Sequence, residues 1–241
     1  MRLHRFYVDQ EINNRTEFVI HSSELVNQVR RVFRLKVGDS LVVFNGTGFD
    51  YECKIDGFGK ENKIDSDNTI RLSVASVSRS RYTPTNNLYL CAAVVKKDNF
   101  EWIVEKSTEL GVTDIFPIAA EHSEKKSLNE NRLKKIAIEA SEQSGRGDAP
   151  RIHAIMGLAG AVEFFKQKNV EMIVFHTEGE RYQESQRDKP VAVFIGPEGG
   201  WSSEELNIFH KHVIMTRSLG PQVLRAETAV IAALSVVIFG T

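Results

Sequence analysis

The stretch FIGPEGGWSSEEL, Phe194 to Leu206, decides how the second half of the chain folds. An apolar strand runs into a turn of glycine, proline and glutamate, and a helix opens at Ser202, where Glu205 completes a capping box. Junctions of this kind at the carboxyl ends of parallel strands are where α/β sheets bind ligands. The stretch therefore predicts an α/β fold with a binding loop at Gly196–Gly200.

Two familiar nucleotide motifs do not describe this loop. A Walker loop needs a lysine and a serine or threonine after the glycines, and none follows Gly200. A dinucleotide fingerprint has a different glycine spacing and an acidic residue about twenty positions later, where this chain has Arg217. A tight turn explains one or two glycines, but it does not explain Glu198 between Pro197 and Gly199.

The rest of the chain divides into two patterns. Many short strand-like runs in residues 1–76, with a hairpin turn at Asn45–Gly48, predict a small β-barrel. Residues 77–241 alternate apolar strands with amphipathic helices, which predicts a parallel α/β sheet covered on both faces. Further capping boxes are predicted where Asp98 precedes Glu101 and where Ser127 precedes Glu130.

Composition favours an ordinary globular protein of the cytoplasm. The 241 residues carry a net charge of −1, and no stretch reaches the ~18 apolar residues of a membrane helix. The N-terminus lacks the apolar segment of a signal peptide. Cys53 and Cys91 lie in apolar surroundings, which predicts buried free thiols. The seven histidines are scattered, so no metal site is expected.

Positive charge gathers near the N-terminus. Residues 1–36 hold seven lysines and arginines against four acidic residues, and Arg30, Arg31 and Arg34 fall within about one helical turn. Such a patch is a weak indication of nucleic-acid binding, and a solvated helix face explains it equally well.

A second cluster, SLGPQVLRAETAV at Ser218–Val230, repeats the strand–loop–helix pattern. IGPEGGWSSEE followed by LGPQVLRAETA resembles the RsmE family of 16S ribosomal RNA uridine-N3 methyltransferases, which belongs to the SPOUT superfamily. KSTELGV at Lys106–Val112, EQSGR at Glu142–Arg146 and RRVFRLKVGD with VFNGTG in the N-terminal third also match that family. The resemblance covers nearly the whole chain.

The resemblance implies a PUA-like β-barrel followed by a SPOUT domain with a trefoil knot, which periodicity alone does not reveal. It implies S-adenosylmethionine as the cofactor, a homodimer, and 16S ribosomal RNA of the small subunit as the substrate. The cofactor residues that it implies follow the strands and form the knot loops: His176, Thr177, Ile195, Gly196, Pro197, Glu198, Gly199, Gly200, Leu219, Gly220 and Leu224.

Uridine N3 must lose a proton before it can attack a methyl group, so a base or a cation near the uracil oxygens is expected. The candidates are Arg146, Arg225 and Glu227, although Arg225 and Glu227 could instead pair with each other. Glu198 is expected to organise its loop by accepting backbone hydrogen bonds. RNA contacts are expected from seven basic residues: Arg2, Arg5, Arg30, Arg31, Arg34, Lys96 and Lys97.

The sequence departs from the family pattern at two places. Gln222 stands where the family often has arginine, and Asn27–Arg30 occupies a stretch that often contains histidine. Two other functions stay open at this point: a SPOUT methyltransferase acting on another RNA position, and an RNA-binding module without catalysis.

Overall fold

The computed structural model describes residues 3–13, 15–59, 68–123, 127–183 and 189–240. The chain forms two compact units, one made of Met1–Thr83 with Ser141–Ala149 and the other of Pro84–Ala140 with Pro150–Thr241. The boundary expected between residues 76 and 77 lies inside a strand, and the return of residues 141–149 to the first unit has no counterpart in the sequence pattern.

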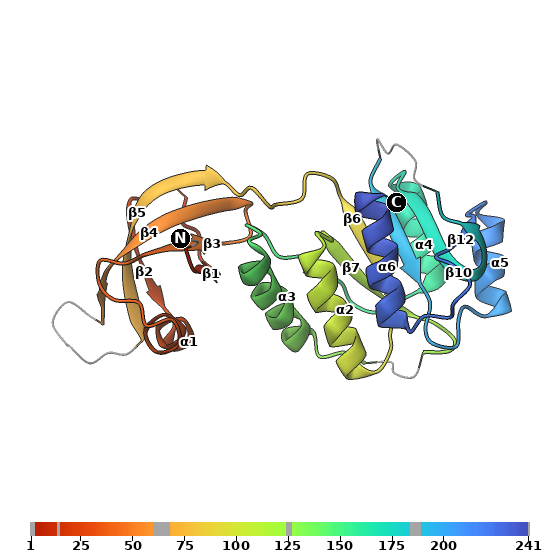
Figure 1. The fold of residues 1–241 in the computed structure, drawn as a ribbon, viewed down its shortest axis with the longest axis horizontal. Coiled ribbons are helices and arrows are strands. Elements are labelled where there is room, and N and C mark those ends of the chain that lie inside the picture. Colours follow the sequence, from red (N-terminus) through yellow and green to blue (C-terminus); the bar gives the residue numbers. More distant parts are fainter. Residues whose placement is uncertain (1–2, 14, 60–67, 124–126, 184–188, 241) are drawn as a thin grey trace. The chain divides into compact units, whose positions relative to one another are not determined.

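The first unit is built on a curled five-stranded sheet with the strand order β1-β3-β4-β5-β2 (Figure 1). Strand β1 runs parallel to β3, and the other neighbours are antiparallel. A short α-helix and one π-helical turn follow β2. The elements are β1 (Arg5–Tyr7), β2 (Glu17–His21), α1 (Ser23–Asn27), η1 (Gln28–Val32), β3 (Ser40–Phe44), β4 (Phe49–Phe58) and β5 (Thr69–Arg79).

Alternating burial along β4 explains how this sheet encloses a core. Tyr51, Cys53 and Ile55 point inward and are buried, whereas the residues between them face solvent or are half-buried. The hairpin predicted at Asn45–Gly48 joins β3 to β4 and is confirmed, with Gly46 and Gly48 at φ of 83° and 82°. Only glycine adopts this left-handed backbone without strain.

The second unit holds a seven-stranded parallel sheet, ordered β12-β10-β11-β6-β7-β8 with β9 beside β7. Helices connect the strands, as the alternating pattern predicts. Its elements are β6 (Leu88–Ala93), α2 (Lys97–Glu109), β7 (Asp114–Ala119), α3 (Glu130–Ser144), β8 (Arg151–Ile152), β9 (Met156–Gly157), α4 (Leu158–Gln167), β10 (Glu171–Arg181), β11 (Val191–Ile195), α5 (Ser203–Lys211), β12 (Thr216–Ser218) and α6 (Ala226–Phe239).

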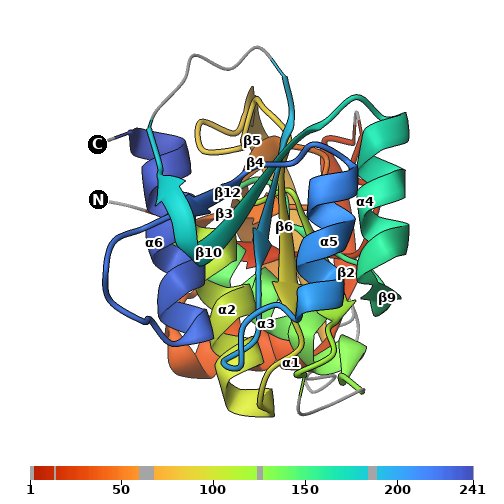
Figure 2. The ribbon, with the colours of Figure 1, turned by 90° about the vertical axis from the view of Figure 1, so that its right-hand side faces the viewer.

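Both faces of the parallel sheet are buried, so its central strands are apolar throughout. On β6, Leu90 and Ala92 join the core formed with α2, α3 and α6, whereas Cys91 and Ala93 join the core formed with α4 and α5. Figure 2 shows α2 and α6 on one side of the sheet and α4 and α5 on the other. The predicted α/β architecture with helices on both faces is confirmed.

Capping boxes were predicted at the N-termini of three helices, and the structure shows which of them form. The box at Ser202 is confirmed, because both reciprocal hydrogen bonds with Glu205 are present. Helix α2 instead begins at Lys97, one residue before the predicted cap Asp98, and has no side-chain cap. At α3 the side chain of Asn129 accepts from Arg132 N at 3.0 Å, so Asn129 rather than Ser127 takes the capping position.

The two cysteines are free and buried, as predicted. Burial raises the pKa of the Cys53 thiol to about 12, and burial raises the pKa of Cys91 well above its usual value. Both thiols are therefore protonated and unreactive at neutral pH. Within the described residues, none of the helices has the length and apolar character needed to span a membrane.

Candidate functional site

A pocket opens in the second unit between the middle of β10 and the carboxyl ends of β11 and β12. The empty space in this pocket, with its open mouth included, is about 660 Å³. Three chain segments and the start of α6 form its walls: Phe175, His176, Thr177, Ile195, Gly196, Pro197, Glu198, Gly200, Trp201, Ser218, Leu219, Gly220, Gln222, Val223, Leu224, Ala226 and Ala229.

The first wall is the loop Gly196–Gly200, which we call the GPEGG loop. A Cβ on Gly196 would lie 3.2 Å from Trp201 Cε2, so the indole occupies the space that a side chain would need. Trp201 is buried and packs edge-on against Phe209 of α5 at 5.4 Å. Gly200 closes the turn by donating to Pro197 O at 2.8 Å, and its φ is +71°. Glycine is required at Gly196 for space and at Gly200 for backbone angle.

The second wall is the segment Leu219–Arg225, which we call the LGPQVLR loop. Its entry is ordered by Ser218, whose hydroxyl accepts from Gly220 N at 3.2 Å and donates to Gly220 O at 3.1 Å. Gly220 has a φ of +145°, a conformation that side-chain-bearing residues rarely adopt. Farther along, Val223 is 81% exposed although it lines the pocket. This loop thus holds several side chains that pack against little else.

The third wall is a bulge in β10. In the pairing of β10 with β12, Phe175 lies opposite Arg217, and so does Glu180. The four β10 residues between Phe175 and Glu180 are therefore unpaired with β12. His176 and Thr177 lie in this bulge, and Gly179 lets it approach the backbone of Arg217, where a Cβ would come within 2.6 Å of the carbonyl carbon. The strand expected to end at Thr177 therefore continues to Arg181 beyond the bulge.

Ten of the eleven residues expected around a cofactor line this one pocket. The exception is Gly199, which is not part of the lining and faces His122 instead. Glu198 lines the pocket, but no hydrogen bond to its carboxylate is found among the described residues. Sequence reasoning missed seven lining residues, most of them next to the recognised motifs: Phe175, Trp201, Ser218, Gln222, Val223, Ala226 and Ala229.

Two of the three expected catalytic residues lie at the start of α6. Arg225 is the N-cap residue of α6, between the pocket-lining Leu224 and Ala226, and it is exposed. Glu227 is half-buried, and its Oε2 has no hydrogen-bond partner in the described part of the chain. Arg225 and Glu227 form no ion pair with each other among the described residues, so their mutual pairing is not supported.

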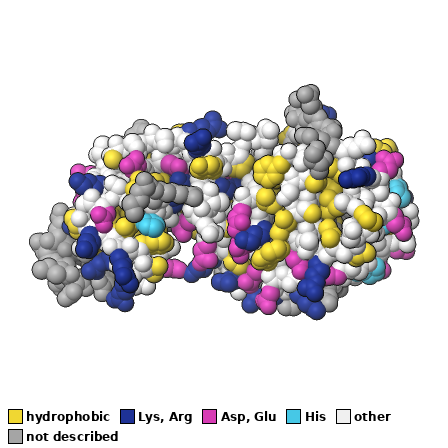
Figure 3. Space-filling view, in the orientation of Figure 1, with side chains coloured by type: hydrophobic (Ala, Val, Ile, Leu, Met, Phe, Trp, Pro, Cys, Tyr) yellow, Lys and Arg dark blue, Asp and Glu magenta, His cyan; other side chains and the backbone are white. Residues whose placement is uncertain are grey.

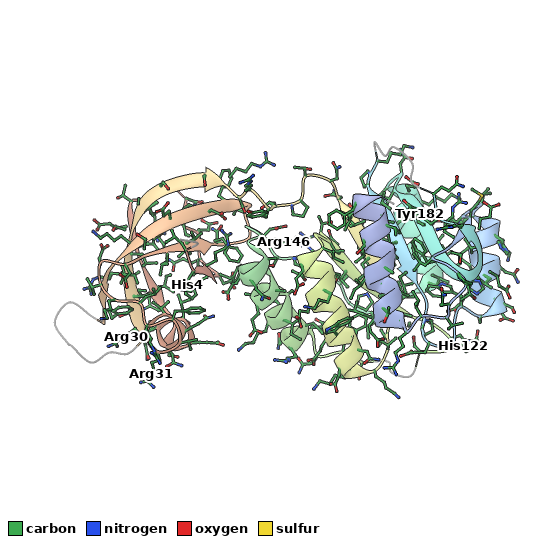
Figure 4. The ribbon with its side chains drawn as sticks, in the orientation of Figure 1. His4, Arg30, Arg31, His122, Arg146 and Tyr182 are labelled. Carbon is green, nitrogen blue, oxygen red and sulfur yellow. The ribbon has the colours of Figure 1, made fainter. Side chains whose placement is uncertain are left out.

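Arg146, the third expected catalytic residue, is part of the first unit (Figure 4). Its side chain is only 2% exposed and pairs with Asp148 through two hydrogen bonds of 3.0 and 2.9 Å. Its backbone carbonyl accepts from Arg5 at 2.9 Å. Removing one partner of such a buried pair is costly, so Arg146 has a structural role here, and its catalytic role stays a prediction.

The expected RNA-contacting residues have different surroundings. Arg30, Arg31 and Arg34 are all exposed, and the first two line a groove with Asn27 and Asn68 (Figure 4). The guanidinium of Arg30 also lies 5.0 Å from the centre of the Phe58 ring.

The other expected RNA-contacting residues differ in exposure. Arg5 is nearly buried, and its Nη1 and Nη2 donate to the two carboxylate oxygens of Asp50 at 2.7 Å each. Lys96 is the N-cap residue of α2, and Lys97 is largely exposed with Glu101 at 3.8 Å. Arg2 lies outside the described residues.

Comparison with protein families matches both units. Residues 82–238 match the family described as RNA methyltransferase domain, and residues 29–63 match the family described as RNA methyltransferase PUA domain. The chain is similar to the ribosomal RNA small subunit methyltransferase E of Rickettsia conorii, with 30% identity over 98% of this chain and 95% of the relative. The protein of the same name from Bacillus subtilis is 28% identical, over 99% and 97%.

Solved structures similar to this chain also include methyltransferases. A Legionella pneumophila methyltransferase in complex with the bound cofactor SAM superposes with a TM-score of 0.83 and 29% identity, over 98% of this chain and 97% of that one. Ribosomal RNA small subunit methyltransferase E of Neisseria gonorrhoeae, bound to S-adenosyl methionine, has a TM-score of 0.82 over 97% and 96%, and its 21% identity indicates a shared fold.

Proposed function

Because the chain belongs to the RNA methyltransferase family that contains the ribosomal RNA small subunit methyltransferases E, we propose that it methylates N3 of one specific uridine in 16S ribosomal RNA with S-adenosylmethionine. The observation that carries this proposal is that the bulge of β10 and the loops after β11 and β12 line one pocket. Two of its three walls come from the motifs IGPEGGWSSEE and LGPQVLRAETA, through which the sequence resembles the family. In that family these loops belong to a trefoil knot.

The chemistry of the pocket suits this cofactor. Ile195, Leu219 and Leu224 supply apolar surface for an adenine ring, and glycines at 196, 200 and 220 bring backbone groups close to a ligand. A Cβ at Gly196 would lie 3.2 Å from Trp201 Cε2, tighter than ordinary packing, so glycine suits this position in the pocket wall. When bound, S-adenosylmethionine supplies a methyl group activated by its sulfonium.

The residues of the chain then have two tasks. The pocket walls hold the donor in place and exclude water, so that the acceptor nitrogen meets the methyl carbon in line. Arg225, exposed beside the pocket, stabilises the negative charge that develops on the uracil oxygens as the N3 proton leaves. Glu227 is the candidate acceptor of that proton, since its Oε2 has no partner among the described residues.

RNA is held by the first unit. Arg30, Arg31 and Arg34 are exposed and close in sequence, and phosphate contacts of this kind fix position without reading bases. The triple variant Arg30→Ala, Arg31→Ala, Arg34→Ala should bind RNA more weakly. The slope of its RNA affinity against salt concentration should fall by the equivalent of about two to three phosphate contacts. A filter-binding titration at several salt concentrations measures this, while cofactor affinity stays unchanged. Unchanged RNA affinity in the triple variant would rule out this surface.

We further propose that the protein acts as a homodimer in the cytoplasm, where 16S ribosomal RNA is found. Helix α6 is apolar along its length, yet Ile238 and Phe239 are exposed on it, and Trp102 of α2 is 41% exposed. Hydrophobic side chains gather over α2 and α6 in Figure 3. An exposed apolar surface of this kind suits contact with a second copy of the chain. Light scattering at micromolar concentration should report a dimer.

Two other functions have less support. A methyltransferase of this superfamily acting on another RNA position would share the pocket, but the match of residues 29–63 to the RNA methyltransferase PUA domain and the resemblance along the whole chain favour the small-subunit target. An RNA-binding module without catalysis does not need a glycine-lined pocket.

Nucleoside mass spectrometry of 16S ribosomal RNA tests the proposal directly. RNA from cells that lack this gene should have lost one N3-methyluridine, and the purified protein with S-adenosylmethionine should restore it. Loss of a different modified nucleotide would favour the second function, and an unchanged set of modifications would favour the third. Supplying naked RNA and isolated small subunits in parallel identifies which one is the substrate.

A further inference from the structure

The GPEGG loop is held from outside the pocket by a histidine that follows β7. His122 Nδ1 lies 3.2 Å from Gly199 O and 3.1 Å from Gly200 O. Carbonyl oxygens only accept hydrogen bonds, so Nδ1 must carry a hydrogen and donate to both. His122 itself is exposed and is not part of the pocket lining (Figure 4). Its contact with the loop therefore acts on the outer side of a pocket wall.

The close approach of His122 explains why position 199 is a glycine. A Cβ on Gly199 would lie 3.0 Å from His122 Cβ and 3.2 Å from His122 Cγ, which is tighter than ordinary packing. Gly199 is not in the left-handed region, unlike Gly200 with its φ of +71°. Two adjacent glycines thus serve two purposes: Gly199 leaves room for the imidazole, and Gly200 turns the chain.

His122 is in turn positioned by the helix that follows the loop. Glu205 is buried, and its Oε1 accepts from Glu121 N at 3.0 Å while its Oε2 accepts from Ser202 N at 2.9 Å. The same carboxylate therefore caps α5 and fixes the residue directly before His122. On the other side of His122 in the sequence, the Ser123 hydroxyl accepts a hydrogen bond from Ala120 N at 3.2 Å, which fixes this turn.

We propose that His122 is a positioning residue for the cofactor: its Nδ1–H holds the Gly199 and Gly200 carbonyls and so keeps Gly200 and its neighbours in the pocket wall. This inference rests on the proposed function of the pocket. A wall that is already ordered costs less to bind against than one that must be ordered by the ligand. His122 acts through the loop, so it should change cofactor affinity and leave turnover at saturating cofactor unchanged.

Two substitutions of nearly identical shape separate this role from a general effect on folding. His122→Asn places an amide N–H near the position of Nδ1 and keeps a donor, whereas His122→Asp places a carboxylate oxygen against two carbonyl oxygens. We expect S-adenosylmethionine to bind the Asn variant within about twofold of the unchanged chain. Binding to the Asp variant should be about tenfold weaker or more, because the donor is lost and repulsion is added.

Isothermal titration calorimetry with S-adenosylmethionine, thermal melting and turnover at saturating cofactor are measured on all three proteins. Equal melting temperatures with weaker binding only in the Asp variant support the inference. Equal affinity in the Asn and Asp variants would overturn it, as would a loss of turnover that saturating cofactor does not restore.

Nuclear magnetic resonance keeps this test separate from that of the proposed function. Without any cofactor, the His122 ring should show a hydrogen on Nδ1 protected from exchange, and its absence would overturn the inference by itself. A protected Nδ1–H in a chain that does not bind S-adenosylmethionine would instead contradict the proposed function, and with it the role of His122 toward the cofactor.

Discussion

The two loops that face each other across the pocket differ in how they are held. The GPEGG loop is fixed at three places: Trp201 fills the space beside Gly196, His122 binds two carbonyls, and the capping box of α5 follows directly. The LGPQVLR loop is ordered by Ser218 at its entry, and Gln222, Val223 and Arg225 are exposed.

This difference in anchoring suggests that the two loops have different roles in binding. A wall that is ordered before the ligand arrives lowers the cost of binding a small cofactor. A wall with exposed side chains suits a large substrate that completes the site when it binds. We therefore propose that the GPEGG loop is a preformed wall for the cofactor. In the LGPQVLR loop, Leu219 and Leu224 complete the cofactor pocket, whereas the exposed Gln222, Val223 and Arg225 meet the RNA.

The largest effect is expected from Arg225→Ala, which removes a charged group from the LGPQVLR loop. Turnover at saturating RNA and cofactor should fall about 10²-fold, the usual loss for one group that stabilises developing charge. The melting temperature should not change, because Arg225 is exposed. Methyl transfer to 16S ribosomal RNA and a thermal melt provide the two measurements.

Arg146→Ala is the matched control, since both arginines were candidates for catalysis. Arg146 is buried against Asp148, so its loss should cost about 2–4 kcal/mol of unfolding free energy. Turnover of the protein that stays folded should be close to normal. If Arg225→Ala instead had a low melting temperature and normal turnover, Arg225 would be the structural residue. The proposed contrast between Arg225 and Arg146 would then be wrong.

A second prediction compares the anchors of the two loops. Glu205→Ala removes a buried carboxylate that accepts two backbone hydrogen bonds, and we expect it to cost about 2–3 kcal/mol of unfolding free energy. Ser218→Ala removes a neutral hydroxyl and should cost about 1 kcal/mol. Urea denaturation measures both. An equal or larger loss for Ser218→Ala would mean that the LGPQVLR loop is anchored as firmly as the GPEGG loop.

The smallest effect is expected at the far end of the helix that starts from the GPEGG loop. Val213, the residue after the C-cap His212 of α5, has a φ of 59°. The following Ile214 donates to Phe209 O at 3.0 Å, the geometry of a C-terminal cap that favours glycine. Val213→Gly should therefore stabilise the protein by about 0.5–1 kcal/mol, the relief of strain less the entropy of glycine.

Helix α4 offers the control for this prediction. It ends in the same geometry with Asn169 at φ 52°, and asparagine tolerates this backbone. Asn169→Gly should change the midpoint of urea denaturation very little. A loss of stability in Val213→Gly would show that the exposed valine contributes more than its backbone strain costs.

Local patterns predicted the parts of the molecule that depend on neighbouring residues. The hairpin at Asn45–Gly48, the α/β alternation and the box of Ser202 with Glu205 depend on residues close in sequence. The pocket-lining residues of the two loops could also be named, because parallel strands bring their carboxyl ends to one edge.

The features that sequence reasoning missed are contacts between distant segments. His122 lies 77 residues from Gly199, and nothing in either segment alone indicates that they meet. The surroundings of Arg146 were not foreseen either, because they depend on which unit receives residues 141–149. Within residues 141–149, Gly147 packs so closely against Ser80 that an added Cβ would not fit. This packing between distant residues places the segment in the first unit.

The central claim is that the pocket between these two loops binds S-adenosylmethionine, and calorimetry on a glycine pair tests it most directly. Gly196→Val would force a side chain into Trp201 and the pocket, whereas Gly160→Val in α4 has nothing within 4 Å of the added Cβ. The unchanged chain and Gly160→Val should bind one S-adenosylmethionine per chain with equal affinity, and Gly196→Val should show no binding while its melting temperature stays close to that of the unchanged chain. Equal binding by Gly196→Val, or no binding by the unchanged chain, would contradict the account.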